Sequence, residues 1–143
     1  MSNAYGKSAL SASITLLNFD DYLAKIEAAG NSIDEACMAA VDAALPSIKE
    51  RMKEGAERHK RSGEVVDAIE VQSARASGNY IYGVVGIDMK KHPEAVHAVY
   101  QEYGDGHSPE FPDPFVAPAI DNHRAEIKKI ERDVLKSKGV PID

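Results

Sequence analysis

The strongest helical pattern in the chain lies in residues 32–60. Ser32 and Glu35 form a capping box, in which each side chain satisfies a backbone amide at the start of a helix. Apolar residues then recur at the three- and four-residue steps of one helix face: Ile33, Cys37, Val41, Ala44, Leu45, Ile48 and Met52. This pattern predicts a long amphipathic helix, kinked at Pro46 because proline removes a backbone hydrogen bond. The densely charged stretch 49–61 predicts a solvated helix end, with Lys49, Lys53 and Glu57 exposed.

Residues 65–73 and 80–87 change to the patterns of strands. The first segment alternates apolar and polar positions, and the second is rich in β-branched and aromatic residues. A turn signal at 76–79 lies between them, so the two segments predict an antiparallel hairpin. Residues 13–17 predict a further short strand and residues 19–26 a short helix. Periodicity leaves open whether residues 95–103 form a third strand or a short helix.

The C-terminal third predicts a proline-rich loop over residues 104–114, followed by a last helix. Asp113 is the expected N-cap and Pro114 the first helical residue. The expected apolar face of this helix consists of Phe115, Ala119, Ile120, His123, Ile127, Ile130 and Val134. Gly139 and Pro141 are expected to end it.

These elements predict an α+β fold. A long N-terminal amphipathic helix and a C-terminal helix pack on one face of a small antiparallel sheet. The length of 143 residues corresponds to a single domain, residues 1–143, in which residues 1–12 are small and polar and expected to be disordered.

Charge and composition narrow the function classes. The formal charge is −6, which argues against a protein that binds nucleic acid by neutralising phosphates. A lone cysteine, Cys37, excludes an internal disulfide, and its place on the apolar stripe predicts a small buried side chain. No apolar run reaches the length of a transmembrane helix.

Candidate chemistry is confined to one polar cluster of histidines and carboxylates: His92, His97, Glu102, Asp105, His107, Glu110 and Asp113. Such groups bind a metal ion when they converge. Their spacing matches no established ligand pattern, and no serine lies in a nucleophile elbow. We therefore expect no catalytic residue, metal or cofactor, and keep a metal-dependent enzyme that uses this cluster as an alternative.

Two segments carry a family resemblance. The long helix ends in a basic stretch that leads through Ser62-Gly63 into Val65, at the place of the pattern (A)P-x-(D)TG-x-L-(R)-x-S-I. Further on, Gln101-Glu102-Tyr103-Gly104 corresponds to a strand ending in (V/Q)EYGT, with Asp105 in place of the threonine. Pro114-Phe115-Val116-Ala117-Pro118-Ala119-Ile120 then corresponds to PF-(L/V)-x-PA-(L/I). In this order, the segments resemble the phage tail-component family, the small head–tail neck and tail-completion proteins of long-tailed phages. The likeness covers about residues 13–138.

The resemblance implies a non-enzymatic component of a phage or prophage virion, assembled in the bacterial host cytoplasm. Proteins of this family form homo-oligomeric rings at the head–tail junction, and both a tail terminator and a head-side neck protein fit. The implied partners are further copies of the chain and other phage neck or tail proteins, with no sequence-specific nucleic-acid binding and no membrane. An acidic lumen would let DNA slide. A generic bacterial interaction domain with the same fold is a further alternative.

The loop 104–114 is the expected contact region. Its prolines fix their own backbone angle and restrict the preceding residue, and a stiff loop loses little entropy on docking. The expected contact residues are Glu102, Tyr103, Gly104, Asp105, His107, Glu110 and Pro112. Of these residues, Glu102, Asp105, His107 and Glu110 are expected outside the core. Pro114, Phe115 and Pro118 start the last helix, and Phe115 and Ile120 are expected to anchor it in the core.

Overall fold

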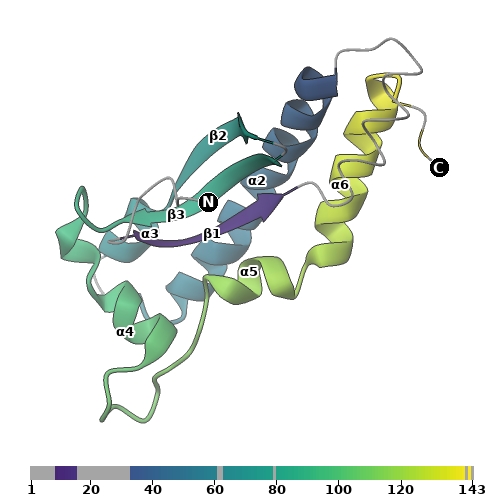
Figure 1. The fold of residues 1–143 in the computed structure, drawn as a ribbon. Coiled ribbons are helices and arrows are strands. Elements are labelled where there is room, and N and C mark those ends of the chain that lie inside the picture. The colour runs from purple at the N-terminus through teal and green to yellow at the C-terminus, as the bar shows by residue number, and fades with distance from the viewer. Residues whose placement is uncertain (1–8, 16–32, 61–62, 79, 141, 143) are drawn as a thin grey trace.

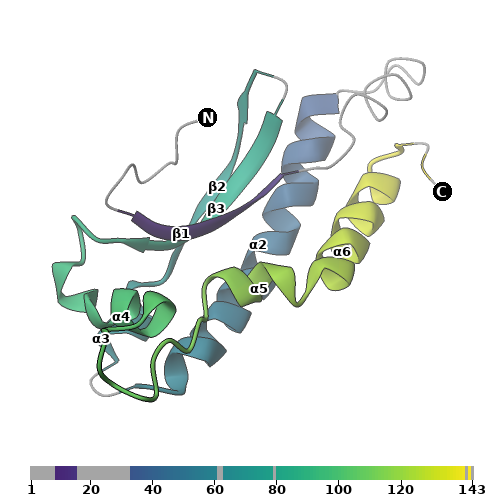
Figure 2. The ribbon, with the colours of Figure 1, turned by 60° about the horizontal axis from the view of Figure 1, so that its bottom comes forward.

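The computed structural model describes residues 9–15, 33–60, 63–78, 80–140 and 142. In this part of the chain, a three-stranded antiparallel sheet in the order β1-β3-β2 lies against helix α2, and helix α6 lies beside α2 (Figures 1 and 2). The predicted α+β class, with the long helix and the C-terminal helix on one side of a small antiparallel sheet, is confirmed.

Helix α2 (Ile33–Glu57) carries the core of the domain. Its stripe is buried as predicted: Cys37, Val41, Ala44, Leu45, Ile48 and Met52. The helix approaches strand β3 closely at Gly83, since a β-carbon at this position would lie 2.8 Å from Cδ1 of Leu45. A larger residue at position 83 would therefore displace the Leu45 side chain and disturb its packing.

Two details of this helix differ from the prediction. Glu57 is exposed, but Lys49 and Lys53 are half-buried, so their expected full exposure is wrong. The helix also ends at Glu57 rather than near residue 60, and residues 58–59 form turns. Ser32 lies outside the described residues, as does the side chain of Ile33.

Strands β2 (Glu70–Ser77) and β3 (Tyr80–Asp88) form the predicted antiparallel hairpin. β3 is the central strand, and its residues 81–87 are buried. A bulge interrupts β2 between Gln72 and Arg75. There the amide of Ala74 donates a hydrogen bond to Oδ1 of Asp42 on α2 at 2.6 Å, which ties the edge strand to the helix.

Strand β1 (Ala9–Thr15) pairs antiparallel with β3, from Ala9 opposite Asp88 to Thr15 opposite Tyr82. The predicted strand over residues 13–17 is therefore shifted toward the N-terminus. The expectation of disorder is wrong for residues 9–12, which belong to β1 because the free edge of β3 pairs with them. Residues 16–17 and the helix predicted over 19–26 lie outside the described residues.

The first part of the predicted strand 65–73 is helical. Helix α3 (Glu64–Ala68) follows Gly63, whose φ of 86° lies in the left-handed region that favours glycine. The amide of Asp67 donates to the carbonyl of Gly63 at 2.9 Å, which closes a helical turn. Val66 and Ala68 are buried against the core, so packing overrides the β propensity of this segment.

Residues 93–103 are helical as well. A 3-10 turn, Pro93–Ala95, leads into helix α4 (His97–Tyr103). Ala95, Ala98 and Gln101 are buried at three-residue steps, a spacing that only a helix places on one side. The family resemblance implies a strand that ends near Tyr103, and this expectation is therefore wrong for this chain.

The last helix is divided into α5 (Ala117–Asp121) and α6 (Arg124–Ser137). Pro118 lies in the first turn of α5, where its missing amide costs little, but Asp113 is not the N-cap. The chain turns at Asn122 and His123, where His123 has a φ of −131°, so that α5 passes the sheet and α6 lies beside α2 (Figure 2). Phe115 and Ile120 are buried as predicted.

Candidate functional site: the arm and the pocket at its base

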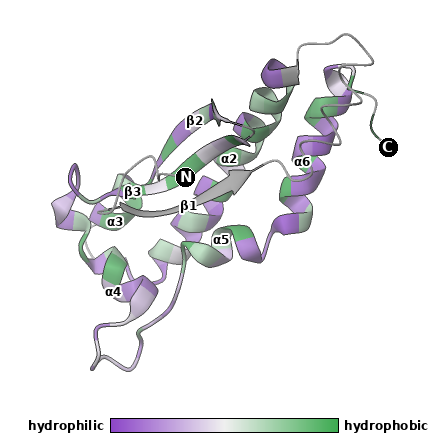
Figure 3. Cartoon of the chain, viewed as in Figure 1, coloured by the Kyte–Doolittle hydropathy of each residue, from purple (hydrophilic) through white to green (hydrophobic). Residues whose placement is uncertain are grey.

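The loop between α4 and α5 projects from the body of the domain (Figures 1 and 2). We call residues 104–114 the arm. Its residues are mostly polar or proline, as the hydropathy colouring in Figure 3 shows. Polar contacts at three places hold it: at its base, at its return to the body and at its tip.

Glu102 clasps the two ends of the arm together. Its Oε1 accepts hydrogen bonds from the amides of Phe115 and Val116, both at 2.8 Å, and its Oε2 accepts one from Ala117 at 3.3 Å. Glu102 is buried, so the expectation that it lies outside the core is wrong. Amides at the start of a helix have no intrahelical acceptor, which explains why a carboxylate is drawn into this place.

Gln101 attaches the same base to α2. Its Nε2 donates to the carbonyl of Gly55 at 2.9 Å, and its backbone carbonyl accepts from the amide of Asp113 at 2.8 Å. A β-carbon at Gly55 would lie only 2.5 Å from Cβ of Phe115. The absence of a side chain at position 55 thus lets Phe115 enter the core.

The returning end of the arm is held by the end of α2. Arg58 donates to both carboxylate oxygens of Asp113, at 2.8 and 2.9 Å, and to the carbonyl of Pro114 at 3.2 Å. Nε2 of His59 lies 2.8 Å from Oδ2 of Asp113. The Arg58 hydrogen bond lowers the pKa of Asp113, and the same bond raises the pKa of the guanidinium. His59 also packs edge-on against Phe111, with ring centroids 4.9 Å apart.

The tip of the arm is a turn built around Asp105. Its Oδ1 accepts from the amides of His107 and Ser108 at 3.0 and 2.7 Å, and its Oδ2 from the Ser108 hydroxyl at 2.5 Å. These bonds, the one from the hydroxyl first, hold the pKa of the carboxyl well below its usual range. Asp105 therefore orders the tip and is itself half-buried, while the His107 side chain is exposed.

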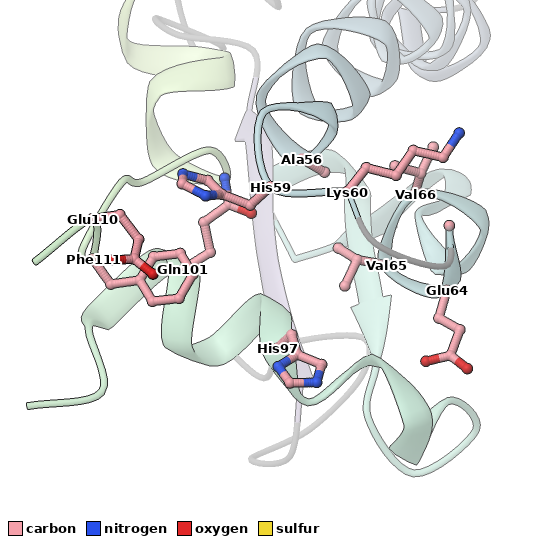
Figure 4. A pocket seen from close by; sticks show the side chains of 11 residues that line it. Ala56, His59, Lys60, Glu64, Val65, Val66, His97, Gln101, Glu110 and Phe111 are labelled. Atoms are coloured by element: carbon pink, nitrogen blue, oxygen red, sulfur yellow. The ribbon is translucent and has the colours of Figure 1, made fainter. Parts of the chain in front are cut away.

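A pocket of about 190 Å³ opens at the base of the arm (Figure 4). In Figure 4, His59, Gln101 and Phe111 lie on one side of it, and Lys60, Val65 and Val66 lie on the other. The remaining lining residues are Ala56, Gly63, Glu64, His97 and Glu110. More than half of the lining residues are polar or charged, and the volume is below the roughly 300–1,000 Å³ of usual ligand pockets.

The other expected contact residues lie along the arm. Tyr103, Glu110 and Pro112 are exposed, and Gly104, with a φ of 89°, turns the chain out of α4. Of the prolines in the family motif, only Pro118 lies within α5. Pro114 is exposed and both Pro114 and Phe115 precede the helix, so the prediction that they start it is wrong.

Most of the histidines and carboxylates of the predicted cluster lie apart, although His97 and Glu110 line the same pocket. Nδ1 of His92 lies 3.1 Å from Oε1 of Glu94. Asp105 accepts hydrogen bonds at the tip of the arm, and Glu102 accepts them at its base. Among the described residues, no three His, Cys, Asp or Glu side chains come together in a way that would hold a metal ion.

Sequence reasoning missed the two residues that bind Asp113. Arg58 and His59 belong to the charged stretch at the end of α2, which we interpreted as a solvated helix end. A basic helix end, combined with a distant loop that carries carboxylates and no Lys or Arg, could have indicated this contact. The sequence does not show which carboxylate is bound.

The chain matches no known protein family, no curated protein and no solved structure. Its likeness to the phage tail-component family therefore depends on the two motifs. Within the described residues, no helix is long and apolar enough to cross a membrane.

Proposed function

We propose that this chain is a structural component of a phage or prophage virion, a ring-forming head–tail neck or tail-completion protein. In this proposal it is not an enzyme, it assembles with copies of itself and with other neck or tail proteins in the bacterial host cytoplasm, and it becomes part of the virion. Both the tail-terminator and the head-side position remain compatible with this role.

The observation that carries the proposal is the clasp formed by Glu102. The two halves of the second motif, 101–104 and 114–120, are separated by the arm in sequence but are joined by Glu102 and the amides of Phe115 and Val116. The two halves of the motif thus close the base of the arm and hold the arm in one conformation. An arm held in one conformation before binding supports a repeated protein–protein contact, because little entropy is lost on docking.

The contacts of the arm also favour binding over catalysis. The carboxylates of Glu102, Asp105 and Asp113 are all occupied by hydrogen bonds that order the chain. His59 faces a carboxylate that Arg58 already binds through both oxygens, so Asp113 is a structural anchor rather than a free partner for a general base.

The test is to delete the gene in the phage or lysogen that encodes the chain and to examine the induced lysate by electron microscopy. We expect separate heads and tails, and intact virions when the parent chain is supplied from a plasmid. Antibody against the chain should label the head–tail junction. Intact, infectious virions without the chain would overturn the proposal and favour the generic interaction domain.

A further inference from the structure

Helix α4 and Val96, the residue before it, expose one apolar face. Val96 and Tyr100 are 41% and 40% exposed, and Tyr103 is 71% exposed. Positions 96, 100 and 103 follow the four- and three-residue steps of one side of a helix. Exposed tyrosines on a rigid element are typical anchors of protein interfaces, because a large ring is buried at little conformational cost.

The segment that carries this face contains no basic residue, although Lys90 and Lys91 precede it and Lys60 lines the same pocket as Glu110. Residues 92–123, which include α4 and the arm, contain six Asp or Glu residues and no Lys or Arg. Arg58 neutralises Asp113, and Asp121 pairs with Arg124, but Glu94 and Glu110 are exposed at this end of the molecule. The tyrosine face therefore lies in an acidic surrounding and fits a basic partner surface.

Helix α6 provides the opposite surface. Residues 124–138 contain six Lys or Arg residues and three Asp or Glu residues, of which Glu131 is buried. Lys128, Arg132 and Lys136 are exposed at four-residue steps. Over the residues that the structure describes, these three side chains form no ion pair with a carboxylate, whereas Lys129 pairs with Asp133.

The two surfaces lie at opposite ends of the molecule (Figures 1 and 3). They cannot meet within one chain, but they meet when copies associate head to tail. A contact between two different surfaces of identical chains closes into a ring when the rotation between copies permits it. A twofold contact through α4 would instead bring acidic surfaces together.

We infer that the tyrosine face of α4 and the neighbouring arm bind the basic face of α6 on a second copy of this chain. This inference rests on the proposed ring-forming function and names its subunit contact. The rings of Tyr100 and Tyr103 provide flat surfaces on which the Arg132 guanidinium stacks and over which the lysine ammonium groups lie. Glu110 and Glu94 provide the attracting charge.

The experiment compares the full parent chain with two variants and their matched controls by sedimentation velocity at low and high salt. Tyr103→Ala removes the most exposed anchor, and Tyr80→Ala removes a tyrosine that is 55% exposed on β3. Arg132→Glu reverses one charge on α6, and Arg75→Glu makes the same change at an exposed site on β2. We expect both test variants to weaken self-association at least about tenfold, the controls to match the parent, and high salt to weaken all of them.

A second measurement locates the contact. Carbodiimide joins carboxylates to amines that touch, and mixing ¹⁴N- and ¹⁵N-labelled chains identifies links between copies by mass spectrometry. Links from Glu110 or Glu94 to Lys128 or Lys136 of the other copy are the expected result.

The following outcomes would overturn the inference, and each can be distinguished from a failure of the proposed function. Association that both test variants retain, or links that map elsewhere, would exclude this contact and leave the ring proposal intact. A parent chain that stays monomeric without links would exclude it too, while the lysate experiment decides the proposed function separately. DNA binding that Arg132→Glu abolishes without affecting association would assign α6 to nucleic acid instead.

Discussion

The base of the arm and the interface between α2 and α6 each bury a glutamate, and the two carboxylates have opposite surroundings. Glu102 is 8% exposed and accepts hydrogen bonds from three backbone amides. Glu131 on α6 is 7% exposed, and within the described residues its carboxylate accepts no hydrogen bond. Its burial raises its pKa to about 7, and Lys128 offsets this rise only in part.

The difference shows that the two regions are stabilised by different forces. Around Glu131 the interface between α2 and α6 is apolar and a charge is unfavourable, and burial there also raises the pKa of the Cys37 thiol to about 11. Elsewhere in the same interface, Glu126 of α6 accepts hydrogen bonds from Ser47 and Arg51 of α2, at 2.7 and 3.2 Å. The arm base is built from polar groups that satisfy one another. A buried carboxylate is therefore favourable where donors satisfy it, as at Glu102, and unfavourable where it accepts no hydrogen bond, as at Glu131.

The largest expected effect comes from removing the aromatic ring that joins the arm base to the core. Phe115 is 2% exposed and lies against Gly55. Phe115→Ala should lower the free energy of unfolding by about 3–5 kcal/mol, because it leaves a cavity. Urea denaturation measures this, with the exposed Glu50→Ala as control, which should change stability by less than about 0.5 kcal/mol. Equal stability of the two variants would mean that the base does not depend on the core.

Glu131→Gln should stabilise the protein, and the gain should depend on pH. The folded-state pKa lies above the unfolded value, so the parent loses stability as pH rises from about 4.5 through about 7. The loss amounts to about 3 kcal/mol above this window. The variant should therefore be more stable than the parent by about this amount at pH 8 and no more stable at pH 4.5. Denaturation curves at both pH values test this, and a gain independent of pH would contradict it.

Glu102→Gln should destabilise the protein by about 1–2 kcal/mol, because the amide side chain retains one acceptor for three backbone donors. The change should be local. Hydrogen exchange should accelerate at the amides of Phe115, Val116 and Ala117. The amides of β3 should exchange faster only by the factor that the loss of global stability accounts for. Unchanged exchange at these three amides would show that the clasp is not needed to close the arm.

The smallest effect concerns the tip of the arm. Asp105→Asn should leave the melting temperature nearly unchanged but accelerate exchange of the His107 and Ser108 amides, which lose a charged acceptor. Glu110→Gln, a neighbouring change in an exposed side chain, should alter neither quantity. If the two variants behave alike, the order of the tip comes from the prolines and not from Asp105.

Local pattern was sufficient to predict the elements whose own residues decide their structure. The apolar stripe of α2 repeats over five turns, so its helix and its buried face follow from spacing, as Val41, Leu45 and Ile48 show. The β2–β3 hairpin follows from two β-rich segments around a short turn. The burial of Phe115 also agrees with its place in the motif.

Only the tertiary structure decided the features that depend on residues far apart in the chain. Helix α4 forms because Ala98 is buried and Gln101 binds Gly55 of α2, a partner that a nine-residue pattern does not reveal. The break between α5 and α6, the clasp of Glu102 and the binding of Asp113 by Arg58 all join segments that the chain brings together only on folding. A sequence records which residues carry charge or apolar surface, but their burial and their partners depend on packing. For this reason one glutamate, Glu102, stabilises the arm base, and another, Glu131, destabilises the interface between α2 and α6.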